Sequence, residues 1–203
     1  MRSQERRYRF AIQGGSVADP VALRDAVRNI EALGYDEFYT SDHVGRPGSD
    51  GRNGEMFAVE PFSPLLIAAE ATERLRVGPL VLNTEFYNPG LLARHVATVD
   101  QLTNGRLVLG MGTGYAAAEH DAIGIPIRSP GPRVTRFGEM LHVLRGLLDN
   151  GAMTFEGEHE SIRMDDLGVE PRQDRVPFLI GGHGLRVVRL AGQYADIFQF
   201  TGL

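Results

Sequence analysis

Short apolar runs in this chain end repeatedly on glycine or on small polar residues, and a helical pattern begins after each of them. Five such endings are Gln13-Gly14-Gly15, Ser41-Asp42-His43, Asn83-Thr84, Gly112-Thr113-Gly114 and Gly181-Gly182-His183-Gly184. Strands that alternate with helices favour a parallel sheet, in which the carboxyl ends of all strands face the same side. The sequence therefore predicts an α/β protein with one ligand-binding rim.

The hydrophobic pattern predicts the order of strands and helices. Strands are expected over residues 7–13, 38–41, 75–83, 106–112, 177–180 and 196–200, and helices over residues 20–33, 61–74, 89–102, 115–120, 134–148 and 185–194. Residues 124–132, which contain three prolines, are expected to break the helical pattern. A complete (β/α)8 barrel takes about 250 residues, whereas this chain has 203. The pattern fits a shortened barrel, a fragment of a longer protein or an open doubly wound sheet.

The composition indicates one domain over residues 1–203, since 42% of the residues are hydrophobic and 23% are charged. The polar, glycine-rich stretch 44–60 is long enough to be a lid, and the stretch 151–176 predicts a hairpin insertion. A net charge of -5 with scattered arginines gives no electrostatic footprint for nucleic acid or an anionic membrane. Because the chain has no cysteine, no signal-peptide pattern and no membrane-spanning stretch, we expect a cytoplasmic protein.

Two glycine-rich turns predict a site for an anionic group. The segment RLVLGMGTGY runs from an apolar strand into Gly112, Thr113 and Gly114, and the turn Gly181-Gly182-His183 follows the next strand. Glycines let a ligand approach the backbone closely, and N–H groups at the start of a helix attract negative oxygens. A simple tight turn is the alternative for either one, but two neighbouring turns favour a phosphate cradle to which Thr113 adds a hydroxyl.

Residues at the ends of the second and third predicted strands are candidates for contact with a ligand. His43 is a candidate for proton transfer near neutral pH, and Asp42 for orienting it or binding the ligand. The alternative is a capping aspartate beside an exposed histidine. Leu80 and Val81 are candidates for an apolar surface against a flat ring, with Asn83 at the edge of that ring, although ordinary packing gives the same pattern.

Histidine spacing predicts no metal site, because the chain has neither a His-x-His nor an HExxH pattern. The remaining histidines are expected to be surface or packing residues. They are His95, His120, His142 and His159.

The order of these segments resembles the bacterial luciferase-like superfamily of flavin-dependent oxidoreductases. The resemblance rests on RFAIQ, LGYDEFYTSDH, RVGPLVLNTEFYNPGLLARHVATVDQLTNGRLVLGMGTGY, VPFLIGGHG and YADIF, which together extend over nearly the whole chain. It is closest to the branch that uses the deazaflavin coenzyme F420. The resemblance implies a TIM-type (β/α)8 barrel, here truncated after about the sixth strand. It also implies that flavin mononucleotide (FMN) or coenzyme F420 binds at the carboxyl rim.

The resemblance also implies roles for individual residues. His43 matches the active-site acid or base, and Asp42 matches a residue that contacts the ring. Leu80-Val81 matches a bulge with a non-prolyl cis peptide behind the ring. Two further groups match the cofactor turns after strands four and five. The group after strand four is Gly112, Thr113 and Gly114, and the group after strand five is Gly181 and Gly182, with His183 next to them.

Tyr115 marks a departure from the family pattern. It stands where sugar-oxidising members of the F420 branch have an acidic residue, so sugar substrates are in doubt, although a tyrosine can still donate a proton. We therefore treat Tyr115 as a second candidate catalytic residue. Nothing in the sequence corresponds to strands seven and eight of the family barrel.

The resemblance predicts an oxidoreductase or monooxygenase that transfers a hydride to or from a small organic substrate. Coenzyme F420 is the first choice of cofactor and FMN the second. A homodimer is expected, since an open barrel leaves its first and sixth strands unpaired at their edges. Two alternatives stay open. One is a non-catalytic, dimerising shortened barrel that binds a flavin, and the other is a metal-dependent hydrolase.

Overall fold

The computed structural model describes residues 8–14, 19–44 and 59–200. The strands are β1 (Ala11–Gln13), β2 (Glu37–Thr40), β3 (Arg76–Pro79), β4 (Leu82–Asn83), β5 (Leu109–Gly112), β6 (Met153–Glu156), β7 (Ser161–Met164), β8 (Phe178–Gly182) and β9 (Ile197–Phe200). The helices are α1 (Pro20–Ala32), α2 (Phe62–Ala71), a short 3-10 turn η1 (Thr84–Phe86), α3 (Pro89–Leu102), α4 (Ala117–Ile123), α5 (Pro130–Asn150) and α6 (Leu185–Tyr194).

The parallel strands follow one another in chain order. Two sheets, β1-β2-β3 and β4-β5-β8-β9, contain them, and a bridge between Val77 and Leu107 joins β3 to the start of the next strand. With β3 and β4 counted as one interrupted strand, the described residues supply six parallel strands, as predicted. A doubly wound sheet reverses its strand order near the middle. This order does not reverse, so the arrangement is that of a (β/α) barrel.

The predicted third strand, over residues 75–83, is divided in two. β3 ends at Pro79 and β4 begins at Leu82, and the Leu80–Val81 peptide bond between them is cis. The cis bond is the one that the family resemblance implied.

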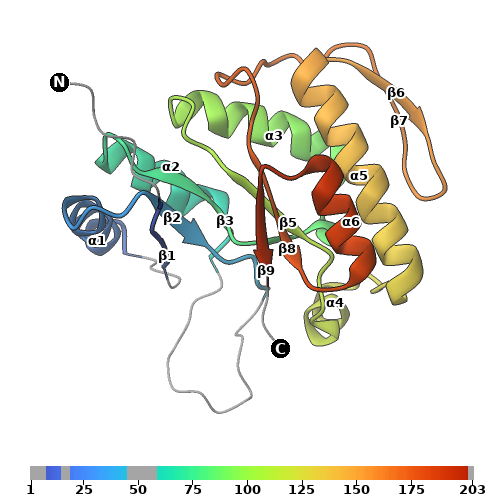
Figure 1. The fold of residues 1–203 in the computed structure, drawn as a ribbon, viewed down its shortest axis with the longest axis horizontal. Coiled ribbons are helices and arrows are strands. Elements are labelled where there is room, and N and C mark those ends of the chain that lie inside the picture. The colour runs from blue at the N-terminus through green and yellow to red at the C-terminus, as the bar shows by residue number, and fades with distance from the viewer. Residues whose placement is uncertain (1–7, 15–18, 45–58, 201–203) are drawn as a thin grey trace.

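Alternating side chains on the strands build two separate apolar clusters. Residues that face outward, such as Phe38, Leu109 and Phe178, join the main core beneath the helices. Residues that face inward form a smaller cluster of Tyr39, Val108 and Leu179, against which Leu80, Val81 and Ile197 pack. Figure 1 shows α1 and α2 beside β1 to β3, and α5 and α6 on the opposite side, next to β8. The inner cluster therefore lies inside the curve of the strands.

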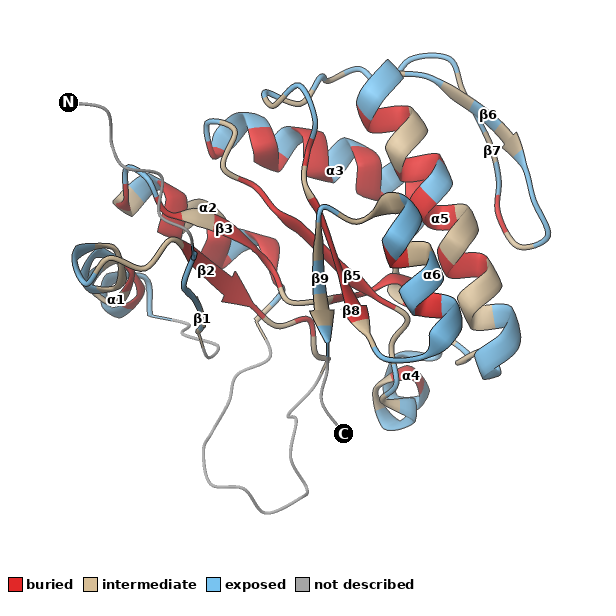
Figure 2. Cartoon of the chain, viewed as in Figure 1, coloured by how far each residue is buried: buried red, intermediate tan, exposed pale blue. Residues whose placement is uncertain are grey.

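Burial differs sharply between the central and the edge strands. β2, β5 and most of β8 are buried, whereas β1 and β9 are only partly covered (Figure 2). Outward-facing aromatic side chains on these two edges stay exposed, with 59% exposure for Phe10, just before β1, and 63% for Phe200 on β9. Both edges of the open barrel thus carry exposed aromatic side chains.

Helix ends largely follow the sequence signals. Asp19 and Asn88 accept hydrogen bonds from N–H groups in the first turns of α1 and α3, and proline is the first residue of each helix. The predicted break over residues 124–132 is partly wrong, because α5 already begins at Pro130. Proline is tolerated in the first helical turn, where its missing N–H has no partner to lose.

The predicted hairpin is present, as β6 and β7 pair antiparallel with Met153 opposite Met164. Glu139 of α5 holds the turn of this hairpin. Its carboxylate accepts hydrogen bonds from the N–H groups of three successive turn residues, Glu158, His159 and Glu160. Of the predicted lid, residues 45–58 lie outside the described residues, so the lid stays a prediction. Within the described ranges, no helix is both long and apolar enough to cross a membrane.

Candidate active site

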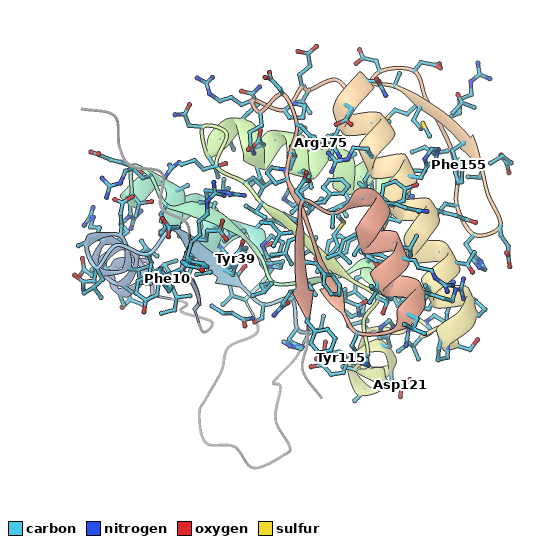
Figure 3. All side chains as sticks on the ribbon, in the orientation of Figure 1. Phe10, Tyr39, Tyr115, Asp121, Phe155 and Arg175 are labelled. Atoms are coloured by element: carbon cyan, nitrogen blue, oxygen red, sulfur yellow. The ribbon has the colours of Figure 1, made fainter. Side chains whose placement is uncertain are left out.

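A cavity of about 560 Å³ opens at the carboxyl ends of the strands. Figure 3 shows Tyr115 at this end of the molecule, beside α4, and Arg175 at the opposite end. All of the residues that the sequence proposed for the site line this cavity: Asp42, His43, Leu80, Val81, Asn83, Gly112, Thr113, Gly114, Tyr115, Gly181, Gly182 and His183. The structure thus brings together side chains from the ends of β2, β4, β5 and β8, while their roles stay predictions.

His43 is paired with a carboxylate that the sequence analysis did not single out. Its Nδ1 lies 2.7 Å from Oε1 of Glu119 on α4, and Oε2 of the same carboxylate accepts the N–H of Val44 at 3.2 Å. A carboxylate only accepts, so Nδ1 of a neutral His43 carries the proton and Nε2 is left as the basic nitrogen. The ring of Tyr115 lies edge-on to the imidazole, with the ring centres 6.3 Å apart.

Asp42 is almost fully enclosed. Its Oδ2 accepts the N–H of Asn83 at 2.9 Å and the hydroxyl of Tyr87 at 3.1 Å, and 9% of the residue is exposed. Burial raises the pKa of Asp42 to about 6, although these two hydrogen bonds and the nearby His43 act in the opposite direction. Burial, together with the Asp42 carboxylate, also raises the pKa of Tyr87. Asp42 is therefore a carboxyl group that changes its charge close to neutral pH.

Asn83 is anchored on both ends of its amide. Its Oδ1 accepts the N–H of Glu85, and its Nδ2 lies 2.9 Å from Nε2 of His120. His120 is fully buried, and its Nδ1 lies 3.0 Å from the carbonyl of Ile125, so Nδ1 donates and Nε2 accepts. Gly114, with a positive φ of 71°, lies against the Asn83 amide, and a Cβ at this position would overlap it. This arrangement fixes the turn after β5, and His120 is a packing residue, as expected.

Val81 joins the two glycine-rich turns. A Cβ built on Gly112 would come within 2.8 Å of the Val81 side chain, and one built on Gly181 within 3.2 Å. A side chain at Gly112 would thus overlap the valine, and one at Gly181 would crowd it. This contact turns the Leu80-Val81 bulge and the two turns into one continuous wall of the cavity.

Sequence reasoning missed three polar residues of the cavity: Glu119, Arg133 and Gln199. Glu119 follows Tyr115 by four residues, which is the spacing of one helical turn, but α4 begins only at Ala117. Gln199 shares the inward face of β9 with Ile197, as strand alternation allows. Arg133 follows directly on the stretch that the prolines marked as a break. Among the described residues, no group of three or more His, Asp or Glu side chains is placed to hold a metal ion.

These features define a class of protein. Parallel strands in barrel order, with a cavity at their carboxyl ends and polar groups that converge on it, are the features of a ligand-binding (β/α) barrel. Residues 7–203 match the family model of the luciferase-like monooxygenases. The chain therefore belongs to the luciferase-like monooxygenase family.

Individual proteins are similar to this chain over most of its length. It is 34% identical to an F420-dependent glucose-6-phosphate dehydrogenase of Nakamurella multipartita, over 90% of this chain and 52% of that protein. It is 29% identical to a 5,10-methylenetetrahydromethanopterin reductase of Archaeoglobus fulgidus, over 84% of this chain and 46% of that protein. The chain spans about half the length of the curated relatives it matches.

A solved structure confirms the fold. The coenzyme F420-dependent tetrahydromethanopterin reductase of Methanopyrus kandleri superposes with a TM-score of 0.80 at 22% identity, covering 95% of this chain and 55% of that one. At this level of identity the likeness establishes the α/β barrel architecture and nothing finer.

Replacing Glu119 with glutamine is expected to change the tautomer of His43. In the wild type, the neutral imidazole carries its proton on Nδ1, because the carboxylate accepts it. An amide can either donate or accept, so Glu119→Gln allows both tautomers. Long-range proton–nitrogen NMR spectra of the histidine ring measure this directly, with Asp121→Asn, at an exposed position on α4 (Figure 3), as the control. A wild-type His43 with its proton on Nε2 would contradict the assignment.

Replacing Asp42 with asparagine is expected to alter how stability depends on pH. The raised pKa means that the folded protein holds this proton more tightly than the unfolded chain, whose Asp pKa is about 3.9. The resulting stabilisation is complete below about pH 4 and is lost as the pH rises through about 6. Relative to wild type, Asp42→Asn should therefore gain on the order of 2 kcal/mol in unfolding free energy between pH 4 and pH 7.

Urea unfolding at several pH values measures this difference. Asp121→Asn removes the same formal charge from an exposed position and so reports the effect of net charge alone. A difference between Asp42→Asn and wild type that stays constant with pH would show that Asp42 does not titrate in this range.

Proposed function

We propose that this chain binds the deazaflavin coenzyme F420 in the rim cavity and passes a hydride to or from a small organic substrate. FMN is the second choice of cofactor. The observation that carries the proposal is the convergence of the His43–Glu119 pair, the Val81 wall and both glycine-rich turns on a single cavity. The name of a relative that is 34% identical, an F420-dependent glucose-6-phosphate dehydrogenase, supports the choice of cofactor.

The cavity fits a group of this kind. Its volume of about 560 Å³ lies within the usual range for small-molecule sites, roughly 300–1,000 Å³. Leu80, Val81 and Val187 give it apolar lining for a flat ring, while the turns at Gly112 and Gly181 expose backbone near polar atoms of a ligand. We assign the ring to the space beside Val81, with Asp42 and Asn83 near its edge. The phosphorylated tail lies towards Gly181, Gly182 and His183, with Thr113 adding a hydroxyl.

The proposed chemistry needs a proton-carrying group beside the ring. The bound coenzyme would supply hydride transfer, and the accompanying proton passes through His43. Glu119 holds Nδ1 of His43 and stabilises the imidazolium when Nε2 takes up a proton. Tyr115 is 78% exposed at the mouth of the cavity. There it donates a proton or contacts the substrate, and it does not reach the buried side of the ring.

The substrate is not carried over from the relatives. Tyr115 stands where the sugar-oxidising branch has an acidic residue, and the carboxylate of Glu119, one helical turn later, is engaged by His43 and the N–H of Val44. We therefore propose a small organic substrate without assigning glucose 6-phosphate. Nothing in the described part of the chain favours a metal-dependent hydrolase, and binding without turnover would identify a non-catalytic flavin-binding protein.

His43→Ala is expected to retain cofactor binding and to lose turnover. Removing a general acid or base lowers rates by roughly 10²- to 10⁴-fold, while the ring keeps its contacts with the Val81 wall. Fluorescence quenching of coenzyme F420 and of FMN measures binding, and bleaching of the bound cofactor with a panel of alcohols, aldehydes and ketones measures turnover. His142→Ala is the matched control, since His142 packs on Phe155 away from this cavity. Unchanged turnover in His43→Ala would remove the catalytic assignment.

We also propose that the chain forms a homodimer. The edge strands β1 and β9 are only partly covered and bear exposed aromatic side chains, which favours association. Light scattering coupled to gel filtration is expected to give twice the monomer mass of 22.3 kDa. A stable monomer at micromolar concentration would overturn this proposal.

A further inference from the structure

Tyr87 lies behind Asp42 and is not one of the residues that line the cavity. Its hydroxyl donates to Oδ2 of Asp42 at 3.1 Å, and the N–H of Asn83 donates to the same oxygen at 2.9 Å. Among the described residues, no donor reaches Oδ1 of Asp42. Asp42 lines the cavity, and Oδ1 is not one of the polar atoms that the protein encloses without a partner. Oδ1 is therefore the oxygen that a bound group can reach.

The position of Tyr87 does not depend on its hydroxyl. Its N–H donates to the carbonyl of Thr84 at 3.2 Å, and its own carbonyl accepts a hydrogen bond from Nη2 of Arg136 at 2.9 Å. Arg136 is buried, and it is held in turn by Glu85 at 3.2 Å and by Glu160 of the hairpin turn at 2.6 Å. The partly buried ring of the tyrosine packs against the main core. Removing the hydroxyl therefore takes away one hydrogen bond and leaves the ring in place.

The two hydrogen bonds to Oδ2 decide which oxygen of a neutral Asp42 carries the proton. An oxygen that accepts from an N–H and from a hydroxyl is stabilised in the form that carries no proton. The proton of neutral Asp42 therefore lies on Oδ1, and the O–H group donates towards the cavity. Burial raises the pKa of Asp42 to about 6, so this neutral form is present close to neutral pH.

Charged groups from the neighbouring elements act on Asp42 in opposite directions. His43, the next residue, favours the carboxylate when it is protonated, whereas Glu119 of α4 favours the neutral acid. Burial raises the pKa of Tyr87, and Asp42 and Glu60 raise it further. The hydroxyl of Tyr87 therefore keeps its proton over the range in which Asp42 titrates. It remains a donor to Oδ2 in both charge states of Asp42.

We propose that Tyr87 is a positioning residue, which fixes Asp42 so that Oδ1 in its protonated form donates a hydrogen bond to an acceptor atom of the bound ring. The proposal rests on the proposed function and adds the atom that makes the contact, its protonation state and the residue that enforces both. Flavins and deazaflavins carry carbonyl oxygens at one end of the ring, and these are acceptors. The imide N–H between those carbonyl groups would instead need the carboxylate form of Asp42 as its acceptor.

Asp42→Asn tests which form of Asp42 binds the ring. In this variant Asn83 and Tyr87 hold the side-chain oxygen, and the amide nitrogen takes the place of Oδ1 as a permanent donor. Fluorescence quenching gives the affinity of both proteins for coenzyme F420 from about pH 5 to about pH 8, on either side of the Asp42 titration. Any other group that titrates is common to both proteins. The affinity of wild type, divided by that of Asp42→Asn, should fall about 10-fold over this range, which corresponds to one hydrogen bond. A ratio that rises with pH would show that the carboxylate is the binding form.

Tyr87→Phe tests the positioning role. Loss of one of two donors to the carboxylate should raise the midpoint of the Asp42 titration by roughly one pH unit, as read from the side-chain carboxyl carbon in NMR spectra. The pH at which the affinity for coenzyme F420 falls should rise by the same amount. Tyr194→Phe removes a hydroxyl from a partly buried tyrosine of α6 that does not line this cavity, and it should leave both midpoints unchanged. A tyrosine needed only for packing would lower the stability without moving either midpoint.

The outcomes separate this inference from the proposed function. The NMR titration needs no cofactor, so an unchanged Asp42 midpoint in Tyr87→Phe disproves the positioning role whether or not a ligand binds. If the ratio of affinities is constant or rises with pH, the contact through Oδ1 is wrong while the ring site stands. If wild type binds neither coenzyme F420 nor FMN, the proposed function is wrong and the contact with the ring is wrong with it.

Discussion

The close approach of the central parallel strands is the constraint on which the rest of the site depends. A Cβ on Gly78 would overlap the carbonyl of Val108, and one on Gly110 would overlap the carbonyl of Pro79, so β3 and β5 meet at glycine. Closer to the carboxyl ends of the strands, Val81 lies against Gly112 and Gly181, where a Cβ would also come too close to its side chain. Larger residues at these positions would push the strands apart and separate the turns that line the cavity. The glycines near the strand ends are therefore needed for packing, whatever their part in binding a ligand.

The site has two electrostatic ends, and the fold explains why they stay apart. Asp42 and His43 follow β2, and Glu119 reaches them from α4, so the proton-exchanging groups gather on one side of the cavity. Arg133 stands at the starts of α5 and α6, on the side of the later strands. Under the proposed function, the redox ring of the cofactor lies beside Asp42 and His43, the groups that can exchange protons.

Much of this arrangement follows from local sequence signals. Asp19-Pro20 and Asn88-Pro89 predict helix starts, and both are confirmed, because a side-chain cap and a following proline act within a single turn. The cavity residues at strand ends were also predictable, since parallel strands present their carboxyl ends to one side. The His43–Glu119 pair was not, because 76 residues separate its members and only the tertiary fold brings them together. The predicted start of α5 was wrong because proline usually breaks a helix, and the sequence alone does not show that Pro130 lies in the first helical turn, where proline is tolerated.

The position of the acidic group in the proposed cofactor site is one of two departures from the sugar-oxidising pattern that the sequence resembles. In the sugar-oxidising branch that the sequence resembles, an acidic residue follows the strand-four turn directly. In this chain Tyr115 occupies that position and is exposed to solvent. The acidic residue Glu119 lies four residues later, and its carboxylate binds Nδ1 of His43. A carboxylate engaged in this way orients the imidazole and stabilises its protonated form instead of exchanging a proton with substrate itself. Under the proposed function, the acid–base role beside the ring thus falls on His43, and Tyr115 at the exposed mouth donates a proton or contacts a substrate other than a sugar phosphate.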